Sequence, residues 1–275
     1  MKKENNHLPQ TTSSLISAND TEELRIAKFI AQRTEYSRRD AEDLVQQGRV
    51  IVNGETLHEL GHKVNPNQDK IMLDGVLLSS KKPRTKIWTF YKPQGLVTTH
   101  KDPQNRETVF DYLKSKGINQ TISIGRLDLN SEGLLILTNN SEFSHYAESP
   151  QTEWKRCYKV RVFGRNIPFD KLLNLKKGIT IDGVHYKGID IELLDHKSFE
   201  QSSNQWLLVT LVEGKNREIR NIMEYFSLRV NRLIRVSYGP FDLGDLKPGE
   251  IKKIDIKNIP EIQNLIFYKN YLNLQ

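Results

Sequence analysis

The sequence contains a single cysteine, Cys157, among 275 residues. An internal disulfide is therefore excluded, and this cysteine content is typical of a protein from a reducing compartment. No stretch approaches the ~18 consecutive apolar residues that a membrane-spanning helix needs. The first residues are charged but no apolar segment follows them, so we expect no secretory signal. We therefore expect a cytoplasmic protein without a membrane partner.

The sequence also lacks the usual signs of a metal or nucleotide cofactor. His58 and His62 have the i, i+4 spacing of a metal-ligand pair, but they fall in a predicted hairpin loop with no third ligand nearby. A glycine-rich phosphate loop and a nucleophile elbow are both absent. His100 and Cys157 have no local partner for a catalytic dyad, and we expect Cys157 in the core. The prediction is a site with no metal and no cofactor.

The composition is that of a globular protein with an excess of positive charge. Hydrophobic residues make up 37% of the chain and charged residues 27%, which allows a sizeable core. The 41 lysines and arginines exceed the 34 acidic residues, giving a net charge of +7. This balance suits a polyanionic partner, although many proteins without such a partner share it.

The chain divides into five predicted segments. They are a polar tail expected to be disordered, a small unit of two helices and a hairpin sheet, a basic linker, a large mainly antiparallel α+β domain, and a C-terminal segment with one helix. Their bounds are residues 1–19, 20–78, 79–86, 87–258 and 259–275.

Capping and turn residues define the small unit. Asp20 and Glu23 have capping-box spacing at the start of a first helix, and Ser37 and Asp40 repeat that spacing at a second helix. Asn-Gly and Asp-Gly pairs predict two tight hairpin turns, at residues 53–54 and 74–75.

Six cations cluster on and around these two helices: Arg25, Lys28, Arg33, Arg38, Arg39 and Arg49. Residues 1–84 nevertheless hold 13 basic and 12 acidic residues, so a solvated helix face is an equally good interpretation. Arg38 and Arg39 are less ordinary, because cations are unfavourable at a helix start. Their position indicates an external anion such as phosphate.

Residues 37–54, SRRDAEDLVQQGRVIVNG, resemble the RNA-binding domain named after a small-subunit ribosomal protein, the S-four domain. The resemblance covers nearly the whole small unit. It implies that structured RNA binds to the second helix and the hairpin edge. The residues that would contact RNA are Arg25, Lys28, Arg38, Arg39 and Arg49.

The stretch over residues 125–140, GRLDLNSEGLLILTNN, joins a polar loop to an apolar run. The run predicts a buried strand over 134–137, so Asp128 and its neighbour Arg126 lie on a loop anchored by a core element. From spacing alone, Asp128 is best interpreted as a turn cap. A calcium loop is excluded, because Asn139 stands where a bidentate glutamate is required.

Residues 215–226 predict a helix whose apolar face is formed by Ile219, Ile222, Met223 and Phe226. Arg217 and Arg220 would lie on the opposite face, roughly 60° apart. With Asp128 and aromatic residues such as Tyr158, these arginines suggest a site with one acid, basic partners and a stacking surface. Structural ion pairs explain such residues equally well.

Several stretches, in order, resemble the pseudouridine synthases of the RsuA/RluB type. They are residues 91–95 with 102–103, residues 125–139, residues 158–164, residues 204–206 with 213–220, and residues 233–236 followed by Gly239. Together with the RNA-binding module they cover about residues 22–258. Asn140-Ser141 departs from the Asp-Gly usual in the family, and we expect this change to affect only a turn.

The resemblance implies isomerisation of a uridine within an RNA chain, so that the base is joined to the sugar through carbon. It assigns Asp128 as the catalytic carboxylate and Tyr158 as the residue that packs on the flipped base. Arg220 is the first choice for the guanidinium beside Asp128. Arg217 is the second choice or a phosphate contact, and Arg126 would contact RNA. Neither metal nor cofactor is implied.

Within the family, residues 204–206 and 213–220 are most similar to the RluB branch, which acts on large-subunit ribosomal RNA. The RsuA branch, which acts on small-subunit RNA, is the alternative. A second alternative is a non-catalytic RNA-binding ribosome-assembly factor. We expect the protein to be a monomer.

Overall fold

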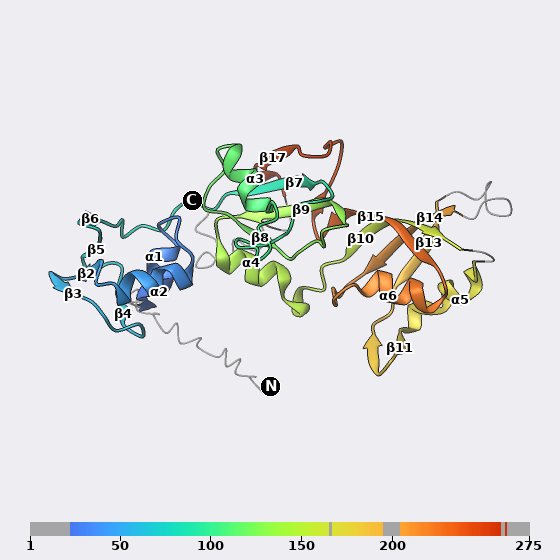
Figure 1. The fold of residues 1–275 in the computed structure, drawn as a ribbon, viewed down its shortest axis with the longest axis horizontal. Helices are drawn as coiled ribbons and strands as arrows, with labels where there is room; N and C mark the ends of the chain where they lie inside the picture. Colours follow the sequence, from blue (N-terminus) through green and yellow to red (C-terminus); the bar gives the residue numbers. More distant parts are fainter. Residues whose placement is uncertain (1–22, 165–166, 195–203, 260–261, 263–275) are drawn as a thin grey trace, which may run out of the picture. The chain divides into compact units, whose positions relative to one another are not determined.

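The computed structural model describes residues 23–164, 167–194, 204–259 and 262. The expected disordered tail, Asp20 and nearly all of the predicted C-terminal helix lie outside these residues. The chain separates into two compact units, Met1–Lys81 and Lys82–Gln275 (Figure 1). This division falls within residues 79–86. In the described part of the chain, no helix is both long enough and apolar enough to cross a membrane.

The small unit packs two helices against short strands around one apolar core. The helices are α1 (Ile26–Ala31) and α2 (Arg38–Gln46). The four-stranded sheet has the order β3 (Glu55–Thr56), β2 (Val50–Val52), β5 (Ile71–Leu73) and β6 (Val76–Leu77). A separate antiparallel pair joins β1 (Leu24–Arg25) to β4 (Lys63–Val64).

The capping prediction is confirmed for the second helix of the small unit and wrong for the first. Ser37 and Asp40 form a reciprocal capping box, with the Asp40 amide donating to Ser37 Oγ at 3.2 Å and the Ser37 amide to Asp40 Oδ2 at 3.0 Å. The first helix begins only at Ile26, after the strand β1. The Ile26 amide donates to the carbonyl of His62, so a pairing distant in sequence keeps the preceding residues extended.

Both predicted hairpin turns are confirmed. Asn53 and Gly54 have φ values of 53° and 93°, and Asp74 and Gly75 have 52° and 78°. Positive φ at both central residues is the requirement of the tight turn that matches strand twist. The turns set the registers of β2 with β3 and of β5 with β6.

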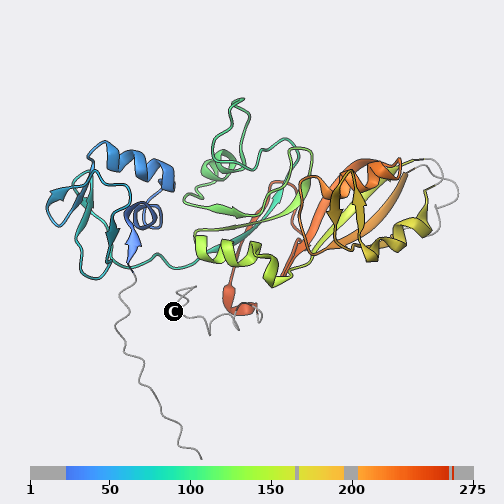
Figure 2. The same ribbon diagram turned by 90° about the horizontal axis from the view of Figure 1, so that it is seen from below.

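The large unit is built on a mixed sheet of nine strands (Figures 1 and 2). Its main path is β13 (Asp190–Leu193), β14 (Asn204–Leu211), β10 (Arg156–Phe163), β15 (Arg229–Tyr238), β9 (Glu132–Thr138), β7 (Ile87–Lys92) and β17 (Ile251–Ile254). The strands β8 (Ile122–Ile124) and β16 (Phe241–Asp242) pair with β9 and β15. Among the described strands of this sheet, every pairing is antiparallel except that of β15 with β9, which confirms the predicted mainly antiparallel α+β class.

The sheet has two halves, and each half carries its own helices. The helices α3 (Val109–Ser115) and α4 (Ser141–Glu148) lie in the half with β7, β8 and β9, whereas α5 (Phe169–Leu173), α6 (Glu218–Tyr225) and the hairpin of β11 (Ile179–Ile181) and β12 (Val184–Tyr186) lie in the half with β10, β13 and β14 (Figures 1 and 2). The halves meet where β9 and β15 pair over two residue pairs, Glu132 with Ile234 and Gly133 with Arg235.

Burial follows the predicted patterns in the central strands. All of β9 is buried, and in β10 the side chains of Val160 and Val162 are buried whereas Lys159 and Arg161 are exposed. Gly133 has φ +100°, and a Cβ there would lie 2.3 Å from the Arg235 carbonyl oxygen. A glycine is therefore required for β9 and β15 to approach this closely.

Three other expectations need correction. Cys157, expected in the core, is only half-buried and its Sγ accepts a hydrogen bond from Thr210 at 3.3 Å. Arg217 does not belong to the helix α6. It is the N-cap residue and has a left-handed backbone, with φ 52°. Asn140 is more than a turn residue, because its side chain accepts from two amides at the start of α4.

Candidate active site

The Asp128 loop, residues 125–131, runs between β8 and β9 at the joint of the two half-sheets. Backbone hydrogen bonds hold it, from the Ser131 amide to the Asp128 carbonyl at 3.0 Å and from the Gly95 amide to the Leu129 carbonyl at 2.9 Å. Leu127 is buried, and Thr98 Oγ1 donates to its carbonyl at 2.8 Å. The loop is thus held by its backbone hydrogen bonds and by the buried Leu127, while the side chains of Arg126 and Asp128 remain exposed.

The Asp128 carboxylate does not cap this turn. Within the described residues it makes no side-chain hydrogen bond, and the turn is closed by backbone groups. The interpretation favoured by spacing alone is therefore wrong. An exposed carboxylate on a rigidly held loop is available to a ligand.

Lys92 supports this loop from inside the protein, and sequence reasoning gave it no role. Its side chain is fully buried, and Nζ donates to the carbonyls of Asp128 at 3.1 Å, Ser131 at 2.9 Å and Pro93 at 3.1 Å. Burial lowers the pKa of Lys92 to about 8, and the negative charges of Asp128 and Glu132 oppose that shift. The ammonium group therefore positions both ends of the turn that carries Asp128.

Glu132, at the start of β9, forms a second buried polar group next to the loop. Its carboxylate receives two hydrogen bonds from Arg232, at 2.7 and 3.0 Å, one from the Tyr91 hydroxyl at 3.0 Å and one from Gln94 at 3.3 Å. These donors, Arg232 first, lower the pKa of Glu132. The residue is committed to a structural ion pair between β9 and β15.

Arg220 projects from α6 across the joint toward the Asp128 loop. Its Nη2 donates to the Asn130 carbonyl at 3.1 Å and its Nη1 to the Val230 carbonyl at 3.1 Å. Burial, followed by the positive charge of Arg217, lowers the pKa of Arg220, and the charge of Asp128 opposes that shift. The structure therefore brings Asp128, Arg220 and Arg217 within electrostatic reach of one another.

Tyr158 lies on β10 with 8% of its surface exposed. It pairs with Val209 of β14 and Arg235 of β15, and its side chain belongs to the same core cluster as Leu127 and Leu135. The ring is therefore held by packing in the half-sheet opposite to the one that carries Asp128.

Glu218, the first residue of α6, is another buried carboxyl that the sequence did not reveal. Its Oε2 accepts from the Lys215 amide at 2.9 Å, whereas Oε1 is buried and has no hydrogen-bond partner among the described residues. Burial raises the pKa of Glu218 to about 7, and the neighbouring charge of Glu213 acts in the same direction.

Because the native pKa of Glu218 is raised, its stabilising protonated form is lost as pH rises toward 7. Glutamine cannot ionise, so we expect the free energy of unfolding of Glu218→Gln at pH 8 to exceed that of the wild type by on the order of 2 kcal/mol, with a higher unfolding temperature. Near pH 4.5 the two proteins should be equally stable. The matched control is Glu224→Gln, an exposed residue of the same helix. Thermal unfolding at both pH values checks this. Equal stabilities at pH 8 would contradict it.

The predicted RNA-binding cations of the small unit differ in their surroundings. Arg38 and Arg39 are exposed in the first turn of α2, as predicted. Arg25, in β1, and Lys28, in α1, are not in the second helix. Arg49 is held by Asp74, through hydrogen bonds of 2.8 and 2.7 Å that raise the pKa of its guanidinium.

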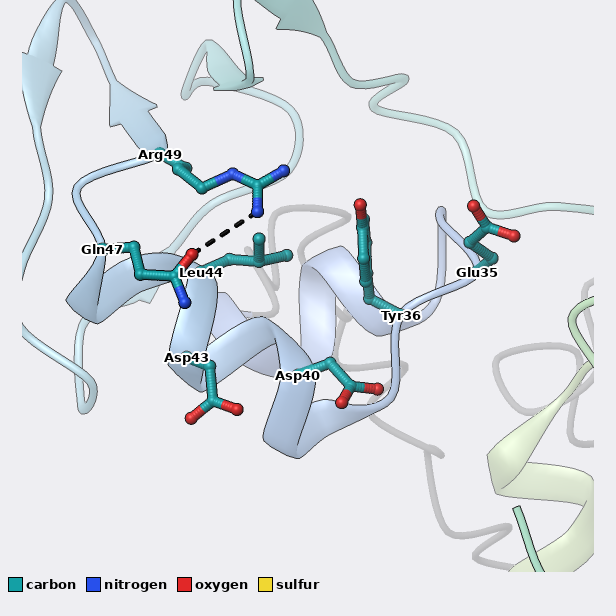
Figure 3. Close-up of a pocket in the computed structure, with 7 residues that line it drawn as sticks. All are labelled: Glu35, Tyr36, Asp40, Asp43, Leu44, Gln47 and Arg49. Atoms are coloured by element: carbon teal, nitrogen blue, oxygen red, sulfur yellow. Dashed lines mark hydrogen bonds between the residues drawn. The ribbon is translucent and has the colours of Figure 1, made fainter. Parts of the chain in front are cut away.

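A hollow of about 400 Å³ lies beside α2 in the small unit (Figure 3). Its lining residues are Glu35, Tyr36, Asp40, Asp43, Leu44, Gln47 and Arg49. Three of them are acidic, and the one cation is already paired with Asp74. The hollow is therefore unsuited to phosphate.

No group of three or more His, Cys, Asp or Glu side chains in the described part of the chain is arranged to hold a metal ion. His62, one of the two histidines at metal-pair spacing, lies 3.6 Å from the carboxylate of Glu59.

Comparison with known proteins defines the class. Residues 86–225 match the RNA pseudouridylate synthase family and residues 24–69 match the S4 domain. The chain belongs to the RNA pseudouridine synthases and carries an N-terminal S4 RNA-binding domain. The fold agrees, since the crystal structure of a pseudouridylate synthase superimposes with a TM-score of 0.59 at 24% identity, covering 87% of this chain and 99% of that one.

Three relatives show how similar this chain is to individual proteins. An uncharacterised RNA pseudouridine synthase of Rickettsia felis is 47% identical over 235 residues, covering 85% of this chain and 97% of its own. Ribosomal large subunit pseudouridine synthase B of Yersinia pestis is 37% identical, covering 88% of this chain and 76% of its own. The protein of the same name in Salmonella typhimurium is 36% identical, covering 88% and 83%.

Proposed function

We propose that this RNA pseudouridine synthase isomerises a uridine in large-subunit ribosomal RNA, with Asp128 as the catalytic carboxylate. The names of the Yersinia pestis and Salmonella typhimurium relatives support the choice of RNA. The observation that carries the choice of residue is the geometry of the Asp128 loop, where Lys92 holds the backbone carbonyl of Asp128 while its exposed carboxylate makes no hydrogen bond within the described residues and lies within electrostatic reach of Arg220.

The reaction breaks the bond from ribose to a base nitrogen and forms a bond from ribose to a base carbon. That carbon loses a proton and the nitrogen gains one, so no other reactant is needed. The target base must first leave its stack, at a cost of a few kcal/mol. Asp128 then acts on the flipped nucleotide, either as a nucleophile or as a base. The positive charge of Arg220 stands beside it throughout.

Three further residues have proposed roles around the flipped uridine. Tyr158 packs against the base, a contact worth about 1–3 kcal/mol for a stacked nucleobase. Arg126, exposed two residues before Asp128, contacts RNA near the vacated position. Arg217, exposed at the N-terminus of α6, binds a phosphate.

The test is conversion of uridine by the purified protein in unmodified large- and small-subunit ribosomal RNA, transcribed from the source organism's genes. We expect pseudouridine in the large-subunit RNA only. Conversion confined to the small-subunit RNA would support the alternative branch. No conversion in either RNA, with assembly intermediates accumulating in a deletion strain, would support a non-catalytic assembly factor.

We propose that the small unit binds the same RNA through Arg38 and Arg39. Replacing both by alanine should weaken binding and lower the slope of log affinity against log salt by about 1.4–1.8, because two fewer phosphates are neutralised. The measurement is RNA affinity across a salt series. The matched control is Lys252→Ala with Lys253→Ala, an adjacent exposed pair on β17. An unchanged slope in the Arg38/Arg39 variant would exclude phosphate contact there.

A further inference from the structure

The half-sheet of β14, β10 and β15 has two faces, and the helix α6 packs against one of them. Val160 and Leu207 lie on that face, in the same core cluster as Ile222 of α6. Alternate residues of a strand point to opposite faces, so the neighbours of these residues lie on the other face, called the outer face below. The residues that β10 contributes to the outer face are all exposed: Lys159, Arg161 and Phe163.

Strand pairing arranges the outer face in three rows, each centred on β10. The rows are Leu208–Lys159–Ile234, Trp206–Arg161–Arg232 and Asn204–Phe163–Arg229. Side chains directly opposite each other in a row have Cβ atoms about 4.5–5.5 Å apart. Trp206 is half-buried, and Phe163 in the next row is 44% exposed. Each row therefore holds a cation, and two neighbouring rows each hold an aromatic ring.

The positive charge of the outer face is not neutralised over β10 and the beginning of β15. Among the described residues, the side chains of Lys159, Arg161 and Arg229 make no hydrogen bond or ion pair. Two carboxylates, Asp190 and Glu192, lie on the same face but in the edge strand β13, where Asp190 pairs with Lys176 at 3.1 Å. The centre of the face therefore suits a polyanion.

The outer face begins next to the Asp128 loop. Glu132, the first residue of β9, pairs with Ile234, so β15 starts well before β9 and its first residues run beside the loop. Arg220 connects the two directly, since it donates to the carbonyls of Asn130 in the loop and Val230 in β15, at 3.1 Å each. Arg229 immediately precedes Val230. An RNA strand with one nucleotide at Asp128 can thus continue over the beginning of β15 onto the outer face.

We propose that the outer face of β14, β10 and β15 binds the single-stranded RNA that flanks the target uridine. The inference rests on the proposed function for the identity of that RNA. Trp206 and Phe163 stack on bases, as exposed aromatic residues of a sheet do in RNA-binding domains. Lys159, Arg161 and Arg229 neutralise phosphates of the same strand.

The charge of the face favours RNA over a protein. The centre of a protein–protein interface is depleted in charged residues, whereas every row of the outer face holds a cation. A second copy of this chain would bring like charges together. Aromatic rings among unpaired cations are instead the combination that binds single-stranded nucleic acid.

The test uses five full-length proteins and a single-stranded oligouridine of about 12 nucleotides as the probe. They are the wild type, Lys159→Ala with Arg161→Ala, Trp206→Ala, Trp206→Phe, and the control Lys252→Ala with Lys253→Ala on β17. Affinity is measured across a salt series, and tryptophan fluorescence is recorded during each titration. The KM for unmodified large-subunit ribosomal RNA is measured in parallel. Thermal unfolding shows that each variant is folded at the assay temperature.

We expect the Lys159/Arg161 variant to bind oligouridine about 5- to 10-fold more weakly and to lower the slope of log affinity against log salt by about 1.4, because two fewer phosphates are neutralised. Trp206→Ala should lose about 5- to 10-fold in affinity with an unchanged slope, whereas Trp206→Phe should keep most of the affinity because a ring remains. The fluorescence quenching seen with the wild type should be smaller in Trp206→Phe, which retains Trp88 and Trp154. KM should rise in the Lys159/Arg161 and Trp206→Ala variants only.

Wild-type affinity and slope in the Lys159/Arg161 variant would overturn the inference and leave the face to a protein partner. A wild type that does not bind oligouridine would overturn it as well. Both outcomes leave the proposed function standing if the wild type converts uridine in ribosomal RNA. A wild type that converts no uridine, but binds oligouridine with the expected dependence on Lys159, Arg161 and Trp206, would overturn the proposed function and retain the outer face as an RNA-binding surface.

Discussion

Replacing Asp128 with asparagine is expected to lower pseudouridine formation by about 10³-fold or more, because the amide can act neither as a nucleophile nor as a base. The loop should keep its shape. Lys92 and the Ser131 amide bind the backbone carbonyl of residue 128, which the substitution leaves in place. RNA affinity should be equal to that of the wild type or slightly higher, since the substitution removes one negative charge that would repel a polyanion.

The measurement is single-turnover conversion with RNA affinity determined in parallel. Asp242→Asn, an exposed aspartate on β16, is the matched control and should convert uridine at the wild-type rate. If Asp128→Asn keeps full turnover, the carboxylate has no catalytic role. If turnover and RNA affinity fall together, Asp128 serves binding rather than chemistry.

Replacing Lys92 with methionine is expected to have the largest effect on the structure of the site. Methionine is similar in length but leaves the carbonyls of Pro93, Asp128 and Ser131 without their shared donor in a buried place. Each unsatisfied buried group costs about 1–3 kcal/mol, and the loss of a buried ammonium with a depressed pKa offsets part of that cost. We expect a net destabilisation of about 2–4 kcal/mol.

Activity should fall further than stability alone explains. A displacement of the Asp128 loop by about 1 Å is enough to cost on the order of 10² in rate. The readout is kcat and KM at a temperature where the variant remains folded, with a loss in kcat as the expected pattern. Lys252→Met, an exposed lysine of β17, is the control. A folded Lys92→Met protein with wild-type kcat would show that the loop does not depend on this ammonium.

Short-range chemistry made much of the fold predictable. The capping box of Ser37 and Asp40 and the two hairpin turns depend on residues no more than three positions apart, and all are confirmed. The apolar run over residues 134–137 is buried, as predicted. A strand covered on both faces is a continuous apolar run, so it can be recognised from the sequence.

Several features that the sequence did not reveal share a cause, which is pairing between residues distant in sequence. The first helix starts late because Leu24 and Arg25 pair with residues 63–64. The roles of Lys92 and of the Arg232–Glu132 pair depend on partners 39 and 100 residues away, which no local pattern reveals. The candidate site is a prediction from motif resemblance, whereas the contacts of Lys92 and Arg232 that support its loop are visible only in three dimensions.

In the proposed function, Asp128 acts on one uridine of large-subunit ribosomal RNA. The most direct test of this function is a map of pseudouridine in ribosomal RNA from a strain that lacks this protein, carrying either the wild-type gene or the Asp128→Asn gene. We expect one large-subunit pseudouridine to disappear in the deletion strain, to return with the wild-type gene and to stay absent with Asp128→Asn. A complete set of pseudouridines in the deletion strain, or full restoration by Asp128→Asn, would contradict it.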